Sequence, residues 1–219
     1  NFTKKHSEKN WPNKSEVIYP PVDVDKIKPL EKKKYILSVG RFFGYLRSKK
    51  QEILIKVFRE LYETGQLKDW KLFLAGAASS GDEPYLDELK KMSQGLPVSF
   101  YPNIEYADLV KLYGQSSLYW HAAGFGDSDP TKMEHFGISI VEAMAGGCVP
   151  IVTKKGGQVE IIQKGCGFLW ETLSDLKKFS LQAMLDADLR LKVSRAAIKR
   201  AKRFSKDMFI EKILKLTNV

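Results

Sequence analysis

From residue 35 onward, short apolar runs alternate with longer segments in which apolar residues recur every three or four positions. The first pattern predicts buried strands and the second predicts amphipathic helices. The predicted strands are 35–39, 71–75, 98–101, 118–121, 149–152 and 167–169. The predicted helices are 49–64, 85–92, 107–113, 137–145 and 159–162, followed by a helical region from 172 to the end that breaks near 204–205.

This alternation predicts an α/β fold. About six parallel strands would form a doubly wound, Rossmann-like sheet with helices on both faces. In such sheets, ligands bind at the carboxyl ends of the strands, near the point where the strand order reverses. Functional residues are therefore expected in the loops that follow the predicted strands.

The first 34 residues differ from the rest of the chain. They are rich in lysine, contain four prolines and show no sustained apolar period. We interpret them as a short basic helix or coil followed by a linker near residues 19–23. The chain does not begin with methionine, which suggests that it is part of a longer protein.

Composition and charge narrow the class of protein. Hydrophobic residues make up 43% of the chain and charged residues 28%, as in a folded globular domain. No stretch approaches the ~20 apolar residues of a spanning helix, and the N-terminus lacks the apolar core of a signal peptide. The two cysteines cannot form a disulfide framework, which favours a reduced, cytoplasmic compartment. The net charge of +10 favours an anionic partner, either nucleic acid, a phosphate-bearing ligand or an acidic membrane.

A basic loop follows the first predicted strand. It begins at Gly40-Arg41 and is followed by Lys49 and Lys50. Gly40 permits a sharp turn, and a guanidinium and an ammonium at this edge can hold a diphosphate. The glycine spacing is not that of a P-loop. These residues leave open the alternative of a solvated basic loop.

Two glutamates bracket a predicted helix start at Gly137. Glu134 lies just before the helix, and Glu142 lies a turn and a half inside it. The amides of Phe136, Gly137 and Ile138 would form an anion site, flanked by carboxylates that accept hydrogen bonds from sugar hydroxyls. Alternatively, Glu134 is a carboxylate that the helix dipole stabilises, and Glu142 is an exposed residue in the middle of the helix.

In sequence order, these segments resemble a known family. The E-x7-E spacing of Glu134 and Glu142, within Glu-His-Phe-Gly-Ile-Ser-Ile-Val-Glu-Ala-Met-Ala-Gly-Gly, is similar to the signature of retaining group 1 (family 4) glycosyltransferases of the GT-B fold. Three further segments agree in order and spacing: 38–42 with Lys49, 72–76, and 149–152 followed by a glycine pair at 156–157. The resemblance runs from about residue 35 to the end.

The resemblance implies the C-terminal, donor-binding half of a two-domain enzyme of carbohydrate biosynthesis. Residues 1–34 would be the last helix of the N-terminal domain and the interdomain linker, 35–203 the nucleotide-sugar-binding domain, and 204–219 a helix packing toward the N-terminal domain. The enzyme would transfer a hexose from a UDP-, GDP- or ADP-linked donor to a saccharide or lipid-linked acceptor held mostly by the N-terminal domain. The chain alone is expected to be inactive.

The resemblance also implies roles for single residues. Arg41 and Lys49 would bind the diphosphate, Glu134 would contact the transferred sugar, and Glu142 would hold the ribose hydroxyls. The amides of 136–138 would hold phosphate oxygens. The expected donor-binding residues are Gly40, Arg41, Lys49, Lys50, Gly76, His121, Glu134, Phe136, Gly137, Ile138 and Glu142, of which Arg41, Lys49 and Glu134 would be catalytic.

No metal or other cofactor is expected, because two cations and a helix N-terminus can stabilise a leaving diphosphate. Asp127 and Asp129 spell the D-x-D sequence that other glycosyltransferases use for a metal, but Asp23 and Asp25 spell it too. The 122–133 loop is longer than is usual in the family, and its role is unassigned. For His121, the alternative to binding the donor is a purely structural role.

Eight basic residues between 190 and 206 form a strongly basic region. It is expected to be solvated or to contact an acidic membrane peripherally at its cytoplasmic face. No motif typical of nucleic-acid binding is present, so no nucleic-acid partner is expected. Two alternatives to an enzyme remain open: a basic module for nucleic acid or membrane, and a non-catalytic nucleotide-sugar-binding domain.

Overall fold

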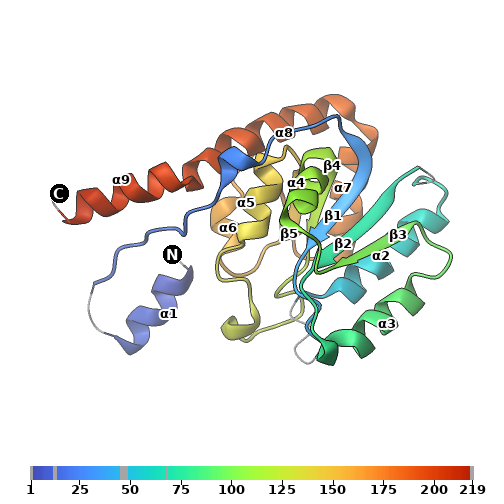
Figure 1. Cartoon of the computed structure of the whole chain (residues 1–219), viewed down its shortest axis with the longest axis horizontal. Coiled ribbons are helices and arrows are strands. Elements are labelled where there is room, and N and C mark those ends of the chain that lie inside the picture. Colours follow the sequence, from blue (N-terminus) through green and yellow to red (C-terminus); the bar gives the residue numbers. More distant parts are fainter. Residues whose placement is uncertain (1, 12–13, 45–48, 68, 218–219) are drawn as a thin grey trace.

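The computed structural model describes residues 2–11, 14–44, 49–67 and 69–217. Within these ranges, six parallel strands form one sheet (Figure 1). The strands are β1 (Lys33–Val39), β2 (Lys71–Gly76), β3 (Val98–Pro102), β4 (Ser116–His121), β5 (Val149–Thr153) and β6 (Phe168–Trp170). Their order is β3-β2-β1-β4-β5-β6, so the strand order reverses between β1 and β4. This doubly wound order confirms the predicted fold class.

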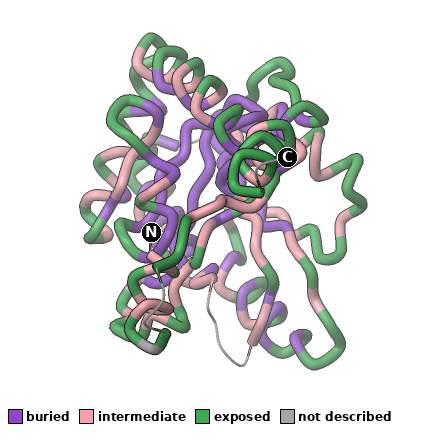
Figure 2. The backbone as a smooth tube through the Cα atoms, turned by 90° about the vertical axis from the view of Figure 1, so that its left-hand side faces the viewer, coloured by how far each residue is buried: buried purple, intermediate pink, exposed green. Residues whose placement is uncertain are grey.

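Helices cover both faces of the sheet (Figure 1). The described helices are α1 (Phe2–Asn10), α2 (Gln51–Glu63), α3 (Glu83–Met92), α4 (Tyr106–Gln115), α5 (Ile138–Ala145), α6 (Gln158–Ile161), α7 (Leu173–Leu185), α8 (Ala187–Ala201) and α9 (Lys206–Thr217). One core lies between the sheet and α2, α3 and α7, and the other between the sheet and α4, α5 and α8. Neighbouring residues of β1 alternate between them: Ile36 joins the first core and Leu37 the second. Figure 2 shows the strands as the buried centre of the molecule.

The C-terminal helical region differs from its prediction. It contains a second break at Asp186, between α7 and α8, in addition to the expected break near 204–205. The Asp186 carboxylate accepts a hydrogen bond from the Leu189 amide at 2.8 Å and so caps the start of α8. This capping hydrogen bond favours the start of a new helix over continuation of the old one. The apolar periodicity is uninterrupted on either side, so it did not predict the break.

The helix predicted for 49–64 begins two residues late, at Gln51. Lys50 precedes it with a left-handed backbone, φ 53°. Lys49 and Lys50 therefore belong to the loop after β1. Their side chains leave from that loop rather than from a regular helical turn.

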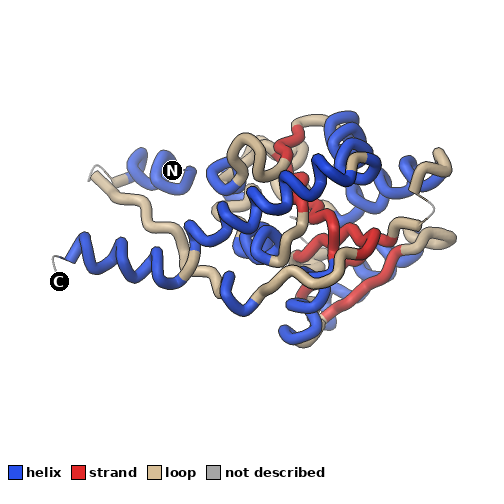
Figure 3. The backbone as a smooth tube through the Cα atoms, turned by 90° about the horizontal axis from the view of Figure 1, so that it is seen from above, coloured by secondary structure: helices blue, strands red, loops and turns tan. Residues whose placement is uncertain are grey.

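The N-terminal segment is partly built into this domain. Val22, Val24 and Ile27 are buried in the core beside α5 and α8. The helices α1 and α9 extend from the same end of the molecule (Figure 3). Within its described length, α9 has no buried residue. The assignment of 1–34 and 204–219 to contacts with another domain stays a prediction.

No helix within the described ranges combines the length and apolar character that crossing a bilayer requires.

Candidate functional site

A pocket of about 410 Å³ lies at the carboxyl end of β1, beside the strand-order reversal and the start of α5. Its lining includes seven of the expected donor-binding residues: Gly40, Lys49, Glu134, Phe136, Gly137, Ile138 and Glu142. The remaining four, Arg41, Lys50, Gly76 and His121, are not part of the wall. Pro20, Val39, His135 and Ser139 complete the lining.

The loop after β1 rests on the loop after β2. The Gly40 amide donates to the Ala75 carbonyl at 2.9 Å, and a Cβ on Gly76 would lie 2.1 Å from the Gly40 oxygen. The Gln51 side-chain amide donates to the carbonyls of Gly40 and Arg41 at 3.3 and 3.1 Å. Gly76 therefore supports the pocket by allowing the two loops to approach, and its position gives it no direct place in the wall.

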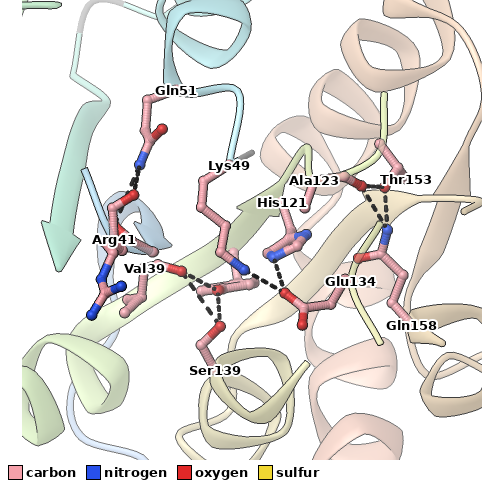
Figure 4. Close-up of polar contacts among 12 residues, drawn as sticks. Val39, Arg41, Lys49, Gln51, His121, Ala123, Glu134, Ser139, Thr153 and Gln158 are labelled. Atoms are coloured by element: carbon pink, nitrogen blue, oxygen red, sulfur yellow. Dashed lines mark hydrogen bonds and ion pairs between the residues drawn. The ribbon is translucent and has the colours of Figure 1, made fainter. Parts of the chain in front are cut away.

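Arg41 lies apart from the centre of the pocket (Figure 4). Its side chain is exposed, and its guanidinium carbon lies 5.9 Å from the centre of the Phe43 ring. The structure thus separates the two cations that the sequence placed together, since Lys49 lines the pocket and Arg41 does not.

An ion pair between Lys49 and Glu134 occupies the centre of the site (Figure 4). The Lys49 ammonium lies 2.6 Å from Glu134 Oε2, and the two side chains are 28% and 17% exposed. His121 Nε2 lies 3.4 Å from the same oxygen, on a side chain that is 3% exposed. Two positively polarised groups therefore converge on one carboxylate oxygen.

The protonation states of these groups follow from burial and charge. Burial opposes ionisation of Glu134, yet its pKa lies well below its usual range because His121 and Lys49 face the carboxylate. Burial lowers the pKa of His121, against the opposing effect of Glu134. Because the imidazole is then neutral at pH 7, Lys49 supplies the positive charge that the Glu134 carboxylate needs.

A buried polar cluster lies behind His121, and the sequence did not reveal it. Gln158 Nε2 donates to the Ala123 carbonyl at 3.2 Å and to the Thr153 hydroxyl. The Thr153 hydroxyl donates to the same carbonyl at 2.8 Å. Among the described residues, neither ring nitrogen of His121 nor Gln158 Oε1 has a hydrogen-bond partner of good geometry. The only sequence signal was the position of Thr153 and Gln158 at the ligand edge, around the glycine pair.

The first turn of α5 opens onto the pocket. Gly137 precedes the helix with φ 112°, a backbone conformation that favours glycine. The amides that begin a helix have no partner within it, so they can bind an anion that reaches this wall. Phe136, Gly137 and Ile138 provide this wall, as expected from the sequence.

Glu142 lies elsewhere along the wall and in different surroundings. Burial raises its pKa, while a hydrogen bond from the Tyr113 hydroxyl to Oε2 at 2.9 Å opposes this effect. The pocket therefore contains two carboxylates, one paired with an ammonium and one with a neutral hydroxyl. Together with the helix start, they can accept hydroxyl hydrogen bonds on either side of a bound phosphate.

Both carboxylates of the D-x-D sequence are engaged within the protein. Lys50 lies 3.1 Å from Asp127, and Asp129 accepts hydrogen bonds from the Thr131 amide and hydroxyl at 2.9 and 2.7 Å. Within the described part of the chain, no three His, Cys, Asp or Glu residues are grouped so that they could hold a metal ion. The independence from metal stays a prediction.

Comparisons with known proteins agree on one family. The family model described as "Glycosyl transferases group 1" matches residues 22–200. A GDP-Man:Man(3)GlcNAc(2)-PP-Dol alpha-1,2-mannosyltransferase of Xenopus tropicalis is 28% identical over 214 residues, covering 90% of this chain. The chain spans 42% of the length of that relative.

Solved structures share the fold. Anabaena Alr3699/HepE, in complex with UDP and glucose, matches 93% of this chain and 57% of its own with a TM-score of 0.77 and 22% identity. The C-terminal domain of a group 1 protein (LpcC) from Francisella tularensis matches 83% of this chain and 96% of its own, with a TM-score of 0.66 and 21% identity.

Proposed function

Because this chain belongs to the group 1 glycosyl transferases, we propose that it is the donor-binding half of a retaining hexosyltransferase. The observation that carries the proposal is the composition of one pocket wall: an ammonium, a helix start and two carboxylates in different electrostatic surroundings. This combination matches a ligand that has a diphosphate between two groups of hydroxyls.

Each part of the donor then has a partner. The amides at the start of α5 and the Lys49 ammonium bind the diphosphate, and Glu142 accepts hydrogen bonds from the ribose. Glu134 faces the transferred sugar. As the sugar departs, negative charge develops on the diphosphate, and the cation and helix start stabilise it without reorganisation. Arg41 joins them only after its exposed side chain turns toward the pocket.

The substrates are inferred from relatives. The Xenopus relative is named for a GDP-mannose donor and a dolichyl-diphosphate-linked acceptor, and the Anabaena neighbour was solved with UDP. We propose a GDP- or UDP-linked hexose as donor and a lipid-linked saccharide as acceptor, held mainly by a second domain. This arrangement also fits peripheral contact of the assembled enzyme with a membrane that carries the acceptor.

Calorimetric titration of the 219-residue chain with GDP, UDP and ADP tests the donor assignment. We expect one nucleotide to bind, and Glu142→Ala and Arg41→Ala each to weaken its affinity about tenfold, or ~1.4 kcal/mol. Lys202→Ala, an exposed cation outside the pocket, is the control and should leave affinity unchanged. Equal affinity in all four proteins would contradict the site assignment.

The chain alone is expected to bind the nucleotide without transferring sugar, since the acceptor is proposed to lie on another domain. A radiolabelled-donor assay with a lipid-linked acceptor checks this, and turnover by these 219 residues would contradict the division between domains. A binding module for nucleic acid would instead ignore free nucleotides and lose affinity steeply with salt.

A further inference from the structure

In this structure Lys49 binds Glu134, whereas the proposed function, on which this inference rests, also requires Lys49 to bind a diphosphate. The ammonium lies 2.6 Å from Glu134 Oε2, so the contact is direct. An entering diphosphate carries more negative charge than the carboxylate and competes for the same ammonium. Nucleotide binding therefore draws the positive charge of Lys49 away from Glu134.

Glu134 cannot lose this partner without cost. Its side chain is 17% exposed, and an ionised carboxylate in such a place is unfavourable unless a cation or several donors face it. The other group in contact with Oε2 is His121 Nε2, at 3.4 Å. The imidazole is thus the available replacement within the described surroundings.

The surroundings of His121 suit a doubly protonated ring. A neutral imidazole has one nitrogen that accepts, but the adjacent Gln158 amide already donates to Ala123 and Thr153. Within the described ranges, the oxygen of that amide, Oε1, is buried without a hydrogen-bond partner of good geometry, as are both His121 nitrogens. Gln158 also raises the pKa of His121, which places its side chain beside the ring. An imidazolium donates from both nitrogens and so satisfies Glu134 on one side and Gln158 Oε1 on the other.

Among the described residues, two charged groups act on the ring: Glu134, which precedes α5, and Lys49, which precedes α2. Tyr119, on the same strand, stacks with its centre 6.3 Å away, and its hydroxyl is bonded to Ser139 and the Val39 carbonyl. Moving Lys49 toward the diphosphate removes the repulsive cation, and the ligand itself adds negative charge.

We propose that His121 takes up a proton when a nucleoside diphosphate binds, and that the imidazolium replaces Lys49 as the partner of the Glu134 carboxylate. The proton comes from water or the buffer acid and forms one new N–H bond on the imidazole; no bond of the nucleotide or the chain breaks. His121 thereby acts as a positioning residue that keeps Glu134 ionised and oriented toward the sugar. Nucleotide affinity then falls by up to about tenfold per pH unit as the pH rises from the lowered pKa of His121 in the free chain to its higher pKa in the complex, and is constant above that.

Calorimetry in two buffers of different ionisation enthalpy measures the proton directly. GDP and UDP are titrated into the 219-residue chain at pH 7, and we expect uptake of about one proton per bound nucleotide. His121→Asn, which remains polar but cannot be protonated, should bind with no uptake. His6→Asn is the matched control, because it changes a histidine that does not line this pocket and should keep both the binding and the uptake.

The outcomes separate the inference from the proposed function. Binding without proton uptake, or uptake that persists in His121→Asn, overturns the inference and leaves the donor site intact. Failure of both nucleotides to bind contradicts the proposed function itself.

A measurement on the unaltered chain covers the case in which His121→Asn does not fold. The sequence contains three histidines, so their ring signals in NMR can be followed individually. We expect one buried ring to change from neutral to charged when the binding nucleotide is added. A buried ring that stays neutral at saturation overturns the inference.

Discussion

At the scale of single residues, the two pocket carboxylates are held in opposite ways. Glu134 has Lys49 at 2.6 Å, and its pKa is held low. Glu142 has the neutral Tyr113 hydroxyl at 2.9 Å, and burial raises its pKa. Glu134 is thus ionised at neutral pH, whereas burial destabilises the ionised form of Glu142. A hydrogen bond from a ligand hydroxyl can offset that destabilisation.

Glu142→Gln should therefore weaken nucleotide binding and at the same time stabilise the free protein. The folded-state pKa of Glu142 is raised, so its destabilising effect is fully present above that pKa and disappears as the pH falls through it. At pH 7 we expect thermal unfolding of the variant about 2 °C above that of the unaltered chain, with the difference narrowing in acid. Differential scanning calorimetry across pH measures this.

Glu83→Gln, at an exposed position in the first turn of α3, is the control for loss of a carboxylate. It should show no pH-dependent gain in unfolding temperature. A Glu142→Gln variant that is less stable than the unaltered chain at pH 7 would show that its carboxylate is not penalised by burial.

At the scale of elements, the glycine pair after β5 fixes the segment that carries Glu134. The Gly157 amide donates to the Glu134 carbonyl at 2.7 Å. A Cβ on Gly157 would lie 1.9 Å from the His135 oxygen, and one on Gly156 would lie 2.3 Å from the Glu134 oxygen. The two backbones therefore touch, and the position of Glu134 depends on the absence of side chains at 156 and 157.

Gly157→Ala should displace the 134–135 backbone, because the added carbon would meet main-chain atoms that cannot turn aside. We expect a loss of about 1–3 kcal/mol in the free energy of unfolding, together with weaker nucleotide binding. Urea denaturation and calorimetric titration measure the two effects. Gly81→Ala is the control, because among the described residues a Cβ there would come no closer than 4.0 Å to its nearest neighbour, Ser79 Oγ. Similar losses in both variants would contradict the steric explanation.

At the scale of the whole molecule, Lys32 ties the segment before β1 to two helix ends. Part of Lys32 is exposed, but its ammonium turns inward, where burial lowers its pKa. It donates to the carbonyls of Tyr113, Ser116 and Gly146 at 3.4, 2.8 and 2.5 Å. These oxygens lie at the end of α4, the start of β4 and the end of α5, so one cation joins three elements near the strand-order reversal.

Lys32→Met should lower the free energy of unfolding by about 1–2 kcal/mol, because three carbonyl oxygens lose the ammonium that they share. Lys28→Met, at an exposed position earlier in the same segment, should have little effect. Chemical denaturation of both variants makes the comparison. Equal stability of the two would mean that water replaces the ammonium at these carbonyls.

The sequence by itself determined the local features of this protein. The apolar periods predicted the six strands and most helices, because period and glycine punctuation reflect which side of each element is buried. Strand ends define the ligand edge of a parallel sheet, so seven residues that line the pocket could be located without coordinates. Their binding of a donor stays a prediction, and Gly76 contributes the close approach of two loops.

Only the tertiary structure decided which of these groups meet. The Lys49–Glu134 contact joins residues that are 85 positions apart, and it depends on β1 and β4 being neighbours in the sheet. The burial of His121 beside the Gln158 side chain depends on the same order, as does the separation of Arg41 from the pocket wall. A local pattern specifies an element and its buried face, whereas charge pairing and burial of polar groups depend on which elements the sheet order places side by side.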